Sequence, residues 1–232
     1  MKILAIGAHP DDIELLCGGT LANHSDEGDE VFMAVMTDGG KGHHEIPPEE
    51  LVRIRMRESE EAAKIIDAKL IWIGIPDGEA TPSLENRIKT IELIRSVDPD
   101  IIITHNPGDY HPDHRGVSAL VLDSLYLSTV PHLRTCSPPC RKLPRLYYMD
   151  SVAGLGFEPE VFIDITENIE VKRRMLSMHK TQVEWMRKHD NIDIIRVMED
   201  LAKLRGHQCG VGYAEAFKPV RIWPARASKT LT

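Results

Sequence analysis

The sequence predicts an α/β fold in which a mostly parallel sheet lies between two layers of helices, as a three-layer sandwich. Two observations predict it. Short apolar runs without polar alternation, typical of strands buried on both faces, recur through residues 1–105 of the 232. The segments between these runs have the apolar spacing of amphipathic helices. Such alternation is typical of parallel strands, because each strand is reached through a crossover helix.

The first half of the chain reads as four strands that alternate with four helices. The opening strand is a continuous apolar run, and the helix after it begins with two carboxylates, which stabilise a helix N-terminus. Gly28-Asp29 forms the turn before the second strand, and Pro99 ends the third helix. The predicted strands are residues 2–7, 30–36, 70–73 and 101–104, and the predicted helices are residues 12–25, 49–67, 84–97 and 115–128.

The second half is less regular. Residues 130–144 are rich in proline and cysteine, and we expect a loop there. Further strands are expected at residues 146–149 and 161–163, and further helices at residues 167–180 and 192–204. Because no repeat or shift in composition marks a boundary, we expect one Rossmann-like domain over residues 1–232, with a disordered tail after about residue 224.

Composition excludes several classes of protein. The hydrophobic fraction of 42% is too high for a disordered chain. The formal net charge of −8 argues against dedicated binding of nucleic acid or anionic membranes, since neither would be attracted overall. No apolar run approaches the roughly 18–20 residues that span a bilayer, and the run over residues 3–8 is too short for a signal peptide. These features predict a cytoplasmic protein.

The four cysteines are too few to form a disulfide scaffold at this length. We expect free thiols, although the spacing of Cys136 and Cys140 leaves a local disulfide open. The same pair resembles half of a zinc site, but no second close pair of cysteines completes it.

Ligand-type side chains follow two of the predicted strands. Strand 2–7 runs into a segment with His9, Asp11 and Asp12, and strand 101–104 leads to a segment with His111, Asp113 and His114. In open α/β sheets, ligands bind at the carboxyl ends of the strands. A doubly wound topology can therefore bring the two segments into one crevice.

The residue types in these segments suit a catalytic metal ion. Three protein ligands with an open water position are typical of catalytic zinc. Imidazoles and carboxylates without thiolates suit zinc, iron(II), cobalt or nickel better than magnesium. The alternative is helix capping, since Asp and Pro are ordinary at helix starts. One cluster alone would favour capping, but two clusters at strand ends of the same sheet favour a metal site.

The same residues lie in motifs that resemble a known family. Residues 7–14 (Gly-Ala-His-Pro-Asp-Asp-Ile-Glu) and residues 111–114 (His-Pro-Asp-His) resemble the two signature motifs of the LmbE-like, or PIG-L, N-acetylglucosaminyl deacetylases. Within the helix predicted at residues 49–67, residues 57–63 (Arg-Glu-Ser-Glu-Glu-Ala-Ala) resemble the Arg-x-x-Glu pattern of a helix of this family. Residues 205–217 resemble its C-terminal signature. The resemblance thus extends over most of the chain.

The resemblance implies hydrolysis of an amide that removes acetate from an N-acetylglucosamine unit. It implies zinc, or another divalent transition metal, as the cofactor, and a homo-oligomer, either a trimer or a hexamer. The site residues that it implies are the metal ligands His9, Asp12 and His114, the general base Asp11, His111 facing the substrate carbonyl, and Asp113 orienting His111.

Elementary chemistry agrees with this division of roles. A metal lowers the pKa of its water towards about 7 and polarises the carbonyl, and a carboxylate then removes one proton. An imidazolium at His111, kept protonated by Asp113, would stabilise the negative charge that develops on the carbonyl oxygen. Either Asp11 or His111 could protonate the leaving amine.

Weaker candidates surround these motifs. Arg53 and Arg57 share a helix face and either reach an anionic group of the substrate or are simply solvated. Asp109 is a candidate substrate contact, and Tyr213 either donates to the oxyanion or packs in the core. Glu14 either has a structural role, which we favour, or contacts a sugar hydroxyl, and His105 either supports a ligand from behind or packs in the core. His43 and His44 are interpreted as a surface pair that could line a cleft mouth, and His179 and His189 are given no role.

Two classes of function compete with deacetylation. The first is an amidase that cleaves a larger acyl group from an amino-sugar conjugate, which only the loops around the pocket would distinguish. The second is a non-catalytic metal-binding or nucleotide-binding module. Against nucleotide binding, the turn after the first strand has no Gly-x-Gly-x-x-Gly pattern, and two carboxylates there would repel a pyrophosphate.

Overall fold

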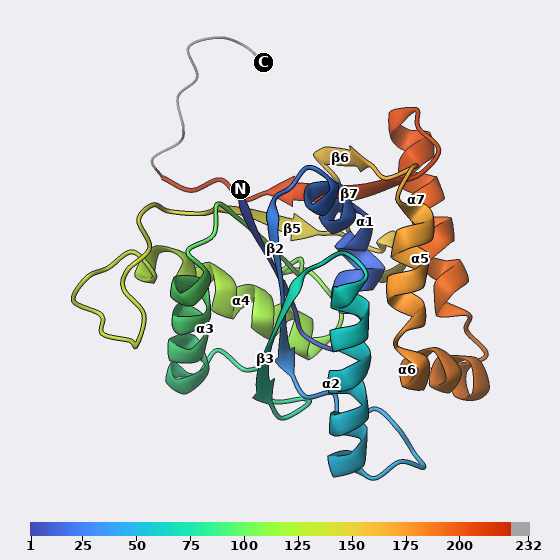
Figure 1. Cartoon of the computed structure of the whole chain (residues 1–232), viewed down its shortest axis with the longest axis horizontal. Helices are drawn as coiled ribbons and strands as arrows, with labels where there is room; N and C mark the ends of the chain where they lie inside the picture. The colour runs from blue at the N-terminus through green and yellow to red at the C-terminus, as the bar shows by residue number, and fades with distance from the viewer. Residues whose placement is uncertain (224–232) are drawn as a thin grey trace.

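The computed structural model describes residues 1–223, which form a seven-stranded sheet in the order β3-β2-β1-β4-β5-β7-β6 (Figure 1). Strands β1 to β5 are parallel to one another, and β7 is antiparallel to both β5 and β6. The strands are β1 (Lys2–Gly7), β2 (Glu30–Thr37), β3 (Lys69–Ile75), β4 (Ile101–Thr104), β5 (Arg145–Met149), β6 (Val161–Asp164) and β7 (Ala214–Pro219). The expected α/β fold is confirmed, and the expected tail lies outside the described residues.

Helices cover both faces of the sheet, as expected (Figure 1). Helices α3 and α4 pack together over one face, and α5 packs against α1, α2 and α7 over the other. Each face has its own apolar core, and β1, which is almost wholly buried, contributes to both. The helices are α1 (Asp12–Asp26), α2 (Pro48–Lys64), α3 (Leu84–Val97), α4 (Pro112–Leu127), α5 (Ile169–Ser177), α6 (Lys180–Trp185) and α7 (Ile194–Cys209).

Two parts of the C-terminal half differ from the sequence prediction. The helix expected at residues 167–180 corresponds to α5, which ends at Ser177. Helix α6, which begins at Lys180, and the π-helical turn at Met186–Asp190 that continues it were not expected. The strand β7 was not expected. Its second residue, Glu215, is buried, accepts hydrogen bonds from the backbone amides of Gly19 and Thr20 in α1, and pairs with Lys172 of α5.

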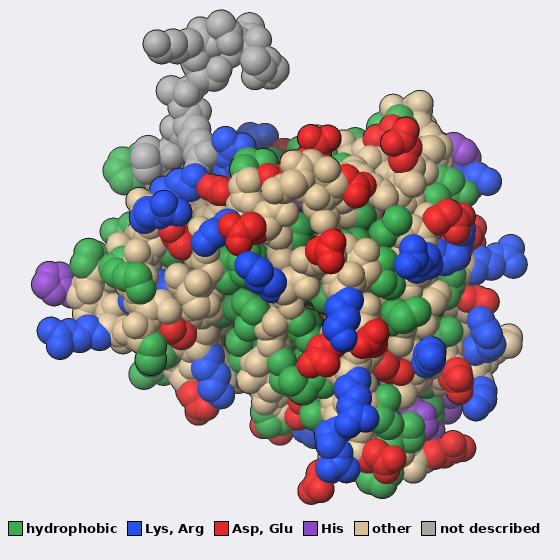
Figure 2. All heavy atoms as spheres, viewed as in Figure 1, with side chains coloured by type: hydrophobic (Ala, Val, Ile, Leu, Met, Phe, Trp, Pro, Cys, Tyr) green, Lys and Arg blue, Asp and Glu red, His purple; other side chains and the backbone are tan. Residues whose placement is uncertain are grey.

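The surface charges and the state of the cysteines agree with what the composition predicts. Figure 2 shows acidic and basic side chains intermixed over the visible face. Within residues 1–223, no helix combines the length and the apolar character that a membrane span requires. Cys17, Cys136, Cys140 and Cys209 are free thiols, so the local disulfide that the sequence left open is absent from the described residues.

Candidate metal centre

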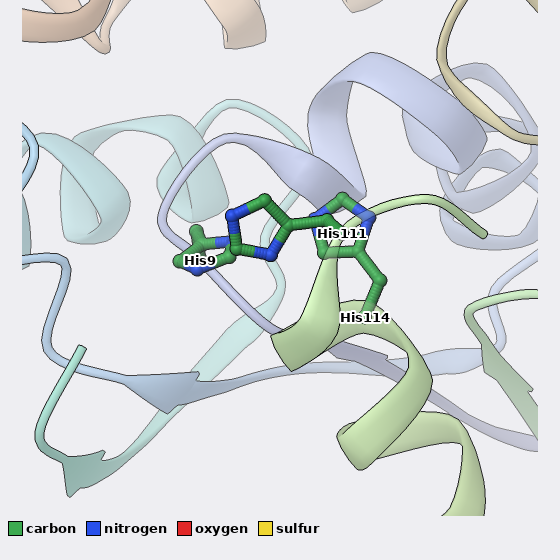
Figure 3. Close-up of side chains that lie close together, drawn as sticks. All are labelled: His9, His111 and His114. Carbon is green, nitrogen blue, oxygen red and sulfur yellow. The ribbon is translucent and has the colours of Figure 1, made fainter. Parts of the chain in front are cut away.

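The centre of the sheet brings the two ligand-bearing segments together. Strand β1 pairs with β4 in parallel, with Ile6 opposite Thr104, so both strands end at the same edge. The chain leaves β1 towards His9 and enters α1 at Asp12, while the chain after β4 reaches His111 and enters α4. Figure 3 shows His9 reaching from the first segment towards His111 and His114 of the second. The expectation of a shared crevice is confirmed in the geometry.

The Asp12 carboxylate lies between two of these imidazoles. One of its oxygens is 3.4 Å from Nδ1 of His9, and the other is 3.3 Å from Nε2 of His114. The first oxygen also accepts a hydrogen bond from the backbone amide of His9 at 2.6 Å. Asp12 and His114 are buried, and His9 is partly exposed. Among the described residues, the ligand atoms of His9, His111 and His114 lie within 4.8 Å of one another, and so do those of Asp12, His105 and His114.

Each of the two imidazoles has a second carboxylate behind it. Nε2 of His9 is 3.1 Å from Asp113, and Nδ1 of His114 is 3.1 Å from Asp109. Imidazoles that bind metals characteristically turn their other nitrogen to a carboxylate, which fixes the ring and raises its basicity. The donor set therefore fits a divalent transition metal, with one carboxylate and two oriented imidazoles.

This arrangement corrects the expected partner of Asp113. Its carboxylate accepts from His9 and from the backbone amides of Gly78 and Ala80, and it makes no described hydrogen bond to the His111 ring. The reason is the start of α4: His111 is the N-cap residue, and its Nδ1 accepts the backbone amide of Asp113, so the two side chains diverge. The loop of Gly78 and Ala80, whose amides bind Asp113, packs closely on α4. A Cβ at Gly116 of α4 would lie 1.8 Å from the carbonyl oxygen of Ala80.

Burial and charge set the protonation of the centre. Burial alone would lower the pKa of His114, but the charges of Asp12 and Asp109 outweigh it and raise this pKa to about 9. Burial also opposes ionisation of Asp12, yet His114 and His105 hold the pKa of Asp12 well below its usual value. His105 itself is fully buried and stacks on His114 with ring centroids 4.0 Å apart, and burial lowers its pKa to about 4. This agrees with the packing role expected for His105.

His111 differs from the other histidines of the centre. It is half-buried, and burial together with the positive charges of His9 and His114 lowers its pKa. The expected imidazolium is therefore disfavoured in the metal-free chain. Because Nδ1 of His111 accepts a backbone amide at 3.3 Å, its proton belongs on Nε2, where the neutral ring remains a hydrogen-bond donor.

Asp11 has an unusual backbone. Its φ of 108° and ψ of −24° lie in the left-handed region, which costs a residue other than glycine about 1–3 kcal/mol and is frequent at active sites. Burial, and then the negative charge of Asp12, raise the pKa of Asp11 to about 7. The positive charges of His179 and Arg55 oppose that rise. A carboxylate with a pKa near neutrality is suited to exchange protons at physiological pH.

A cavity of about 220 Å³ opens onto the centre. Its walls include His9, Asp11, Asp12, His111 and His114, which are five of the six residues singled out at the strand ends. The lining also includes polar and aromatic residues that the sequence did not single out for the site, namely Arg55, Asp77, Tyr110, Gln182 and Trp185.

The weaker candidates lie elsewhere. Arg53 and Arg57 are exposed on α2 and do not line the cavity, whereas Arg55, on the opposite side of the helix, is buried and donates to the carbonyl oxygens of Gly39 and Gly42. Asp109 is buried behind His114 and does not line the cavity either. Tyr213 packs against the core beneath α1 and α5, as its alternative interpretation predicted.

Sequence analysis missed a buried pair beneath Asp11. Nε2 of His179 lies 3.0 Å from a carboxylate oxygen of Glu14, and both residues are almost completely buried. Burial lowers the pKa of His179, but the charges of Glu14 and Asp11 reverse this and raise it. The expected structural role of Glu14 is consistent with this contact. No spacing in the sequence links His179 to Glu14, because they come from α1 and the α5–α6 turn.

The protonation of His114 predicts how metal binding varies with pH. A metal must displace the proton from a ring whose pKa is about 9, and the raised pKa of His9 acts in the same direction. Apparent affinity for Zn²⁺ should therefore rise at least about tenfold per pH unit from pH 7 to 9. Calorimetric titration of metal-free protein, in buffers with different heats of ionisation, measures both the affinity and the protons released. An affinity that stays flat over this range would contradict the protonated His114.

Comparisons with known proteins place this site in context. A family model described as PIG-L, GlcNAc-PI de-N-acetylase, matches residues 4–125. The diacetylchitobiose deacetylase of Thermococcus kodakarensis is 29% identical over 191 residues, which cover 78% of this chain and 70% of that protein. The uncharacterized deacetylase YaiS of Escherichia coli is 31% identical over 188 residues, covering 77% of this chain and 90% of that protein.

A solved structure agrees with the sequence matches. The N,N'-diacetylchitobiose deacetylase from Pyrococcus horikoshii superposes with a TM-score of 0.82 and 28% identity, covering 94% of this chain and 83% of that one. The residues matched by the family model include β1, β4 and both ligand-bearing segments. The chain belongs to the PIG-L family of de-N-acetylases.

Proposed function

We propose that this protein is a zinc-dependent hydrolase that removes the acetyl group from a substrate containing N-acetylglucosamine. One observation carries the proposal: Asp12 lies between two imidazoles, each backed by its own carboxylate, and Asp11 and His111 line the same cavity. The relatives support the substrate class, since two of those named above are deacetylases of an acetylated glucosamine compound.

The proposed metal ligands are His9, Asp12 and His114. When bound there, zinc would supply a Lewis acid that acidifies a water molecule and polarises the amide carbonyl. Iron(II), cobalt and nickel accept the same donor types. Asp113 and Asp109 then act through the rings, by holding His9 and His114 in one orientation.

Asp11 is the proposed general base. Its pKa of about 7 in the metal-free chain allows it to accept one proton from the attacking water at neutral pH. The water oxygen then bonds to the carbonyl carbon. Asp11 can return the same proton to the nitrogen as the carbon–nitrogen bond breaks, which yields acetate and a free amine. Since His111 is neutral in the metal-free chain, we assign this last proton to Asp11 rather than to His111.

His111 is the proposed donor to the developing oxyanion. The N–H at its Nε2 remains available because Nδ1 is occupied by the amide of Asp113. A donor that is fixed before the reaction stabilises charge without having to reorganise. For the sugar hydroxyls, the cavity offers the Asp77 carboxylate, the Arg55 guanidinium and the Gln182 amide.

Loss and return of metal test the proposal. The zinc-loaded protein should release acetate and a primary amine in equal amounts from N-acetylglucosamine compounds, and removal of metal by a chelator should abolish this release. Activity should return when stoichiometric Zn²⁺ is added. Full activity in protein shown by elemental analysis to be metal-free would contradict the proposal.

We also propose that the enzyme acts in the cytoplasm, as one domain per chain and as a trimer or hexamer, in line with the family resemblance and the length of the chain. Light scattering coupled to size-exclusion chromatography tests the assembly. A monomer at micromolar concentration would contradict it.

A further inference from the structure

A pair of histidines outside the metal centre lies where two distant segments of the chain meet. His44 belongs to the loop after β2, and His189 belongs to the π-helical turn that continues α6. Their Nε2 atoms are 3.1 Å apart, and both side chains are exposed. Neither ring lines the metal-centre cavity, so the proposed hydrolysis does not use them. Two imidazole nitrogens that face each other either share a proton or bind one metal ion.

The distance between the two nitrogens suits two ligands of one ion. Zinc–nitrogen bonds measure about 2.0–2.1 Å, so two imidazoles at the tetrahedral angle place their nitrogens about 3.3–3.4 Å apart. At the right angle of a square-planar or octahedral ion, bonds of this length place the nitrogens about 2.9 Å apart. The observed 3.1 Å lies between these values. One ion therefore fits both rings with little movement of either segment.

A carboxylate fixes the proton of His189. Its Nδ1 lies 2.8 Å from Oδ1 of Asp190. Because an ionised carboxylate only accepts hydrogen bonds, the proton of the neutral ring belongs on Nδ1, and the lone pair of Nε2 faces His44. Histidines that bind metals share this arrangement, in which one nitrogen donates to a carboxylate and the other holds the ion. In the metal-free chain His44 donates its proton to that lone pair. An ion takes the place of this proton, which then moves to Nδ1 of His44.

Trp185 holds both rings in place. Its ring stacks on His189 with centroids 4.3 Å apart and meets His44 edge-on at 4.4 Å. Groups that are already fixed lose less conformational entropy when they bind a ligand. The carboxylate of Glu45 lines the same cavity of about 370 Å³, so this oxygen donor and water can fill the remaining positions on an ion. Trp185 also lines the metal-centre cavity, so the pair lies beside the wall between the two.

The neighbouring His43 does not offer a ligand atom. Its Nδ1 accepts the backbone amides of Glu45 and Ile46, so its proton belongs on Nε2 and neither nitrogen has a free lone pair. It lines the same cavity as His44 and contacts Trp185, with ring centroids 5.2 Å apart. His43 is therefore the matched control for any test of the pair.

We propose that His44 and His189 bind a second divalent transition-metal ion, separate from the ion of the proposed catalytic centre. Imidazole donors favour zinc, nickel or copper over magnesium. The ion would tie the loop after β2 to the end of α6, beside the wall that Trp185 contributes to both cavities. This site is independent of the proposed deacetylase activity, because its two donors lie outside the metal-centre cavity.

Calorimetric titration with Zn²⁺ tests the pair. Protein that already holds one Zn²⁺ per chain should bind a second with a Kd of roughly 1–100 µM, since only two protein ligands are proposed for it. His44→Ala and His189→Ala should each raise this Kd at least about tenfold. His43→Asn, which keeps an acceptor for the two backbone amides, should retain the wild-type Kd. His114→Ala should lose the catalytic ion and keep this one, so the two sites fail separately. Wild-type protein without a second binding event, or one that both alanine variants retain unchanged, would overturn the proposal.

The fluorescence of Trp185 locates the ion. Ni²⁺ is an open-shell ion that quenches an indole nearby, and Trp185 contacts both proposed ligands. Ni²⁺ added to the zinc-loaded protein should therefore quench part of the tryptophan fluorescence and reach saturation. The saturable part should disappear in Trp185→Phe and in His44→Ala, and it should remain in His43→Asn. Mg²⁺ at the same concentration should have no effect. Equal saturable quenching in His44→Ala and the wild type would place the ion elsewhere and reject the pair as its site.

Discussion

Asp11→Asn should lower kcat for deacetylation by roughly 10²–10⁴-fold, which is the usual contribution of a general base. The substitution keeps the size of the side chain and removes its ability to accept the proton. Asparagine also tolerates the left-handed backbone that Asp11 adopts, so the loop should keep its shape. Metal content should remain near the wild-type value because Asp11 is not a proposed ligand. Steady-state kinetics and elemental analysis of the same preparation check both parts.

The control for this variant is Asp67→Asn. Asp67 is another aspartate with a positive φ, at 51°, but it is exposed and lies just before the start of β3, at the opposite end of the parallel strands from the ligand-bearing segments. Its variant should therefore retain full activity. If Asp11→Asn retains kcat, Asp11 is not the base. If it loses metal, the proposed roles of Asp11 and Asp12 must be exchanged.

His114→Ala should remove the metal and, with it, the activity. Substitution of a residue that only hydrogen-bonds to a metal-binding side chain lowers metal affinity about 10–100-fold. Loss of one of the three proposed ligands themselves should therefore lower the affinity further. The variant also leaves the buried carboxylates of Asp12 and Asp109 without the ring that lies between them. Elemental analysis after dialysis should give about one ion per wild-type chain and a small fraction of that in the variant.

The matched control is His207→Ala, which removes an exposed histidine near the end of α7. It should keep both metal and activity. Circular dichroism separates loss of metal from loss of fold, since His114→Ala should retain the helical spectrum. A folded His114→Ala protein that still holds one ion per chain would remove His114 from the ligand set.

The meeting of the two ligand-bearing segments was predictable from topology alone. Parallel strands β1 and β4 end at the same edge of the sheet, so His9, Asp12 and His114 had to approach one another wherever their side chains pointed. The direction of each side chain was not predictable in the same way. At the start of α4, a backbone amide occupies His111, and Asp113 turns to His9 instead.

Helix α2 also shows that the direction of a side chain is harder to predict than the position of its helix. Its buried residues Leu51, Arg55 and Ser59 are spaced four apart, and this row faces the protein interior. Arg53 lies two residues away from Arg55 and therefore on the opposite side. The position of Arg55 in this buried row was the sequence signal that could have identified it as a residue that faces the site. The contacts of Trp185 with His43 and His44 had no such signal, because they join segments about 140 residues apart.

The strand β7 escaped prediction because it carries a buried charge. Glu215 stands in a short strand whose other buried residues are two alanines and a phenylalanine. Partners from α1 and α5 satisfy this carboxylate, and neither is visible along the strand itself. Helix α6, which follows the break near His179, was not predicted either.

The ties of Glu215 to α1 and α5 bear on whether the family-matched segment could fold by itself. Residues 4–125 contain every proposed metal ligand. Yet that segment alone would turn β4 into an unpaired edge strand and leave the amides of Gly19 and Thr20 without their acceptor. It would also remove His179 from Glu14, directly below the site. We therefore expect that the matched segment does not fold independently, and that the C-terminal half of the chain is needed to hold the site in its N-terminal half.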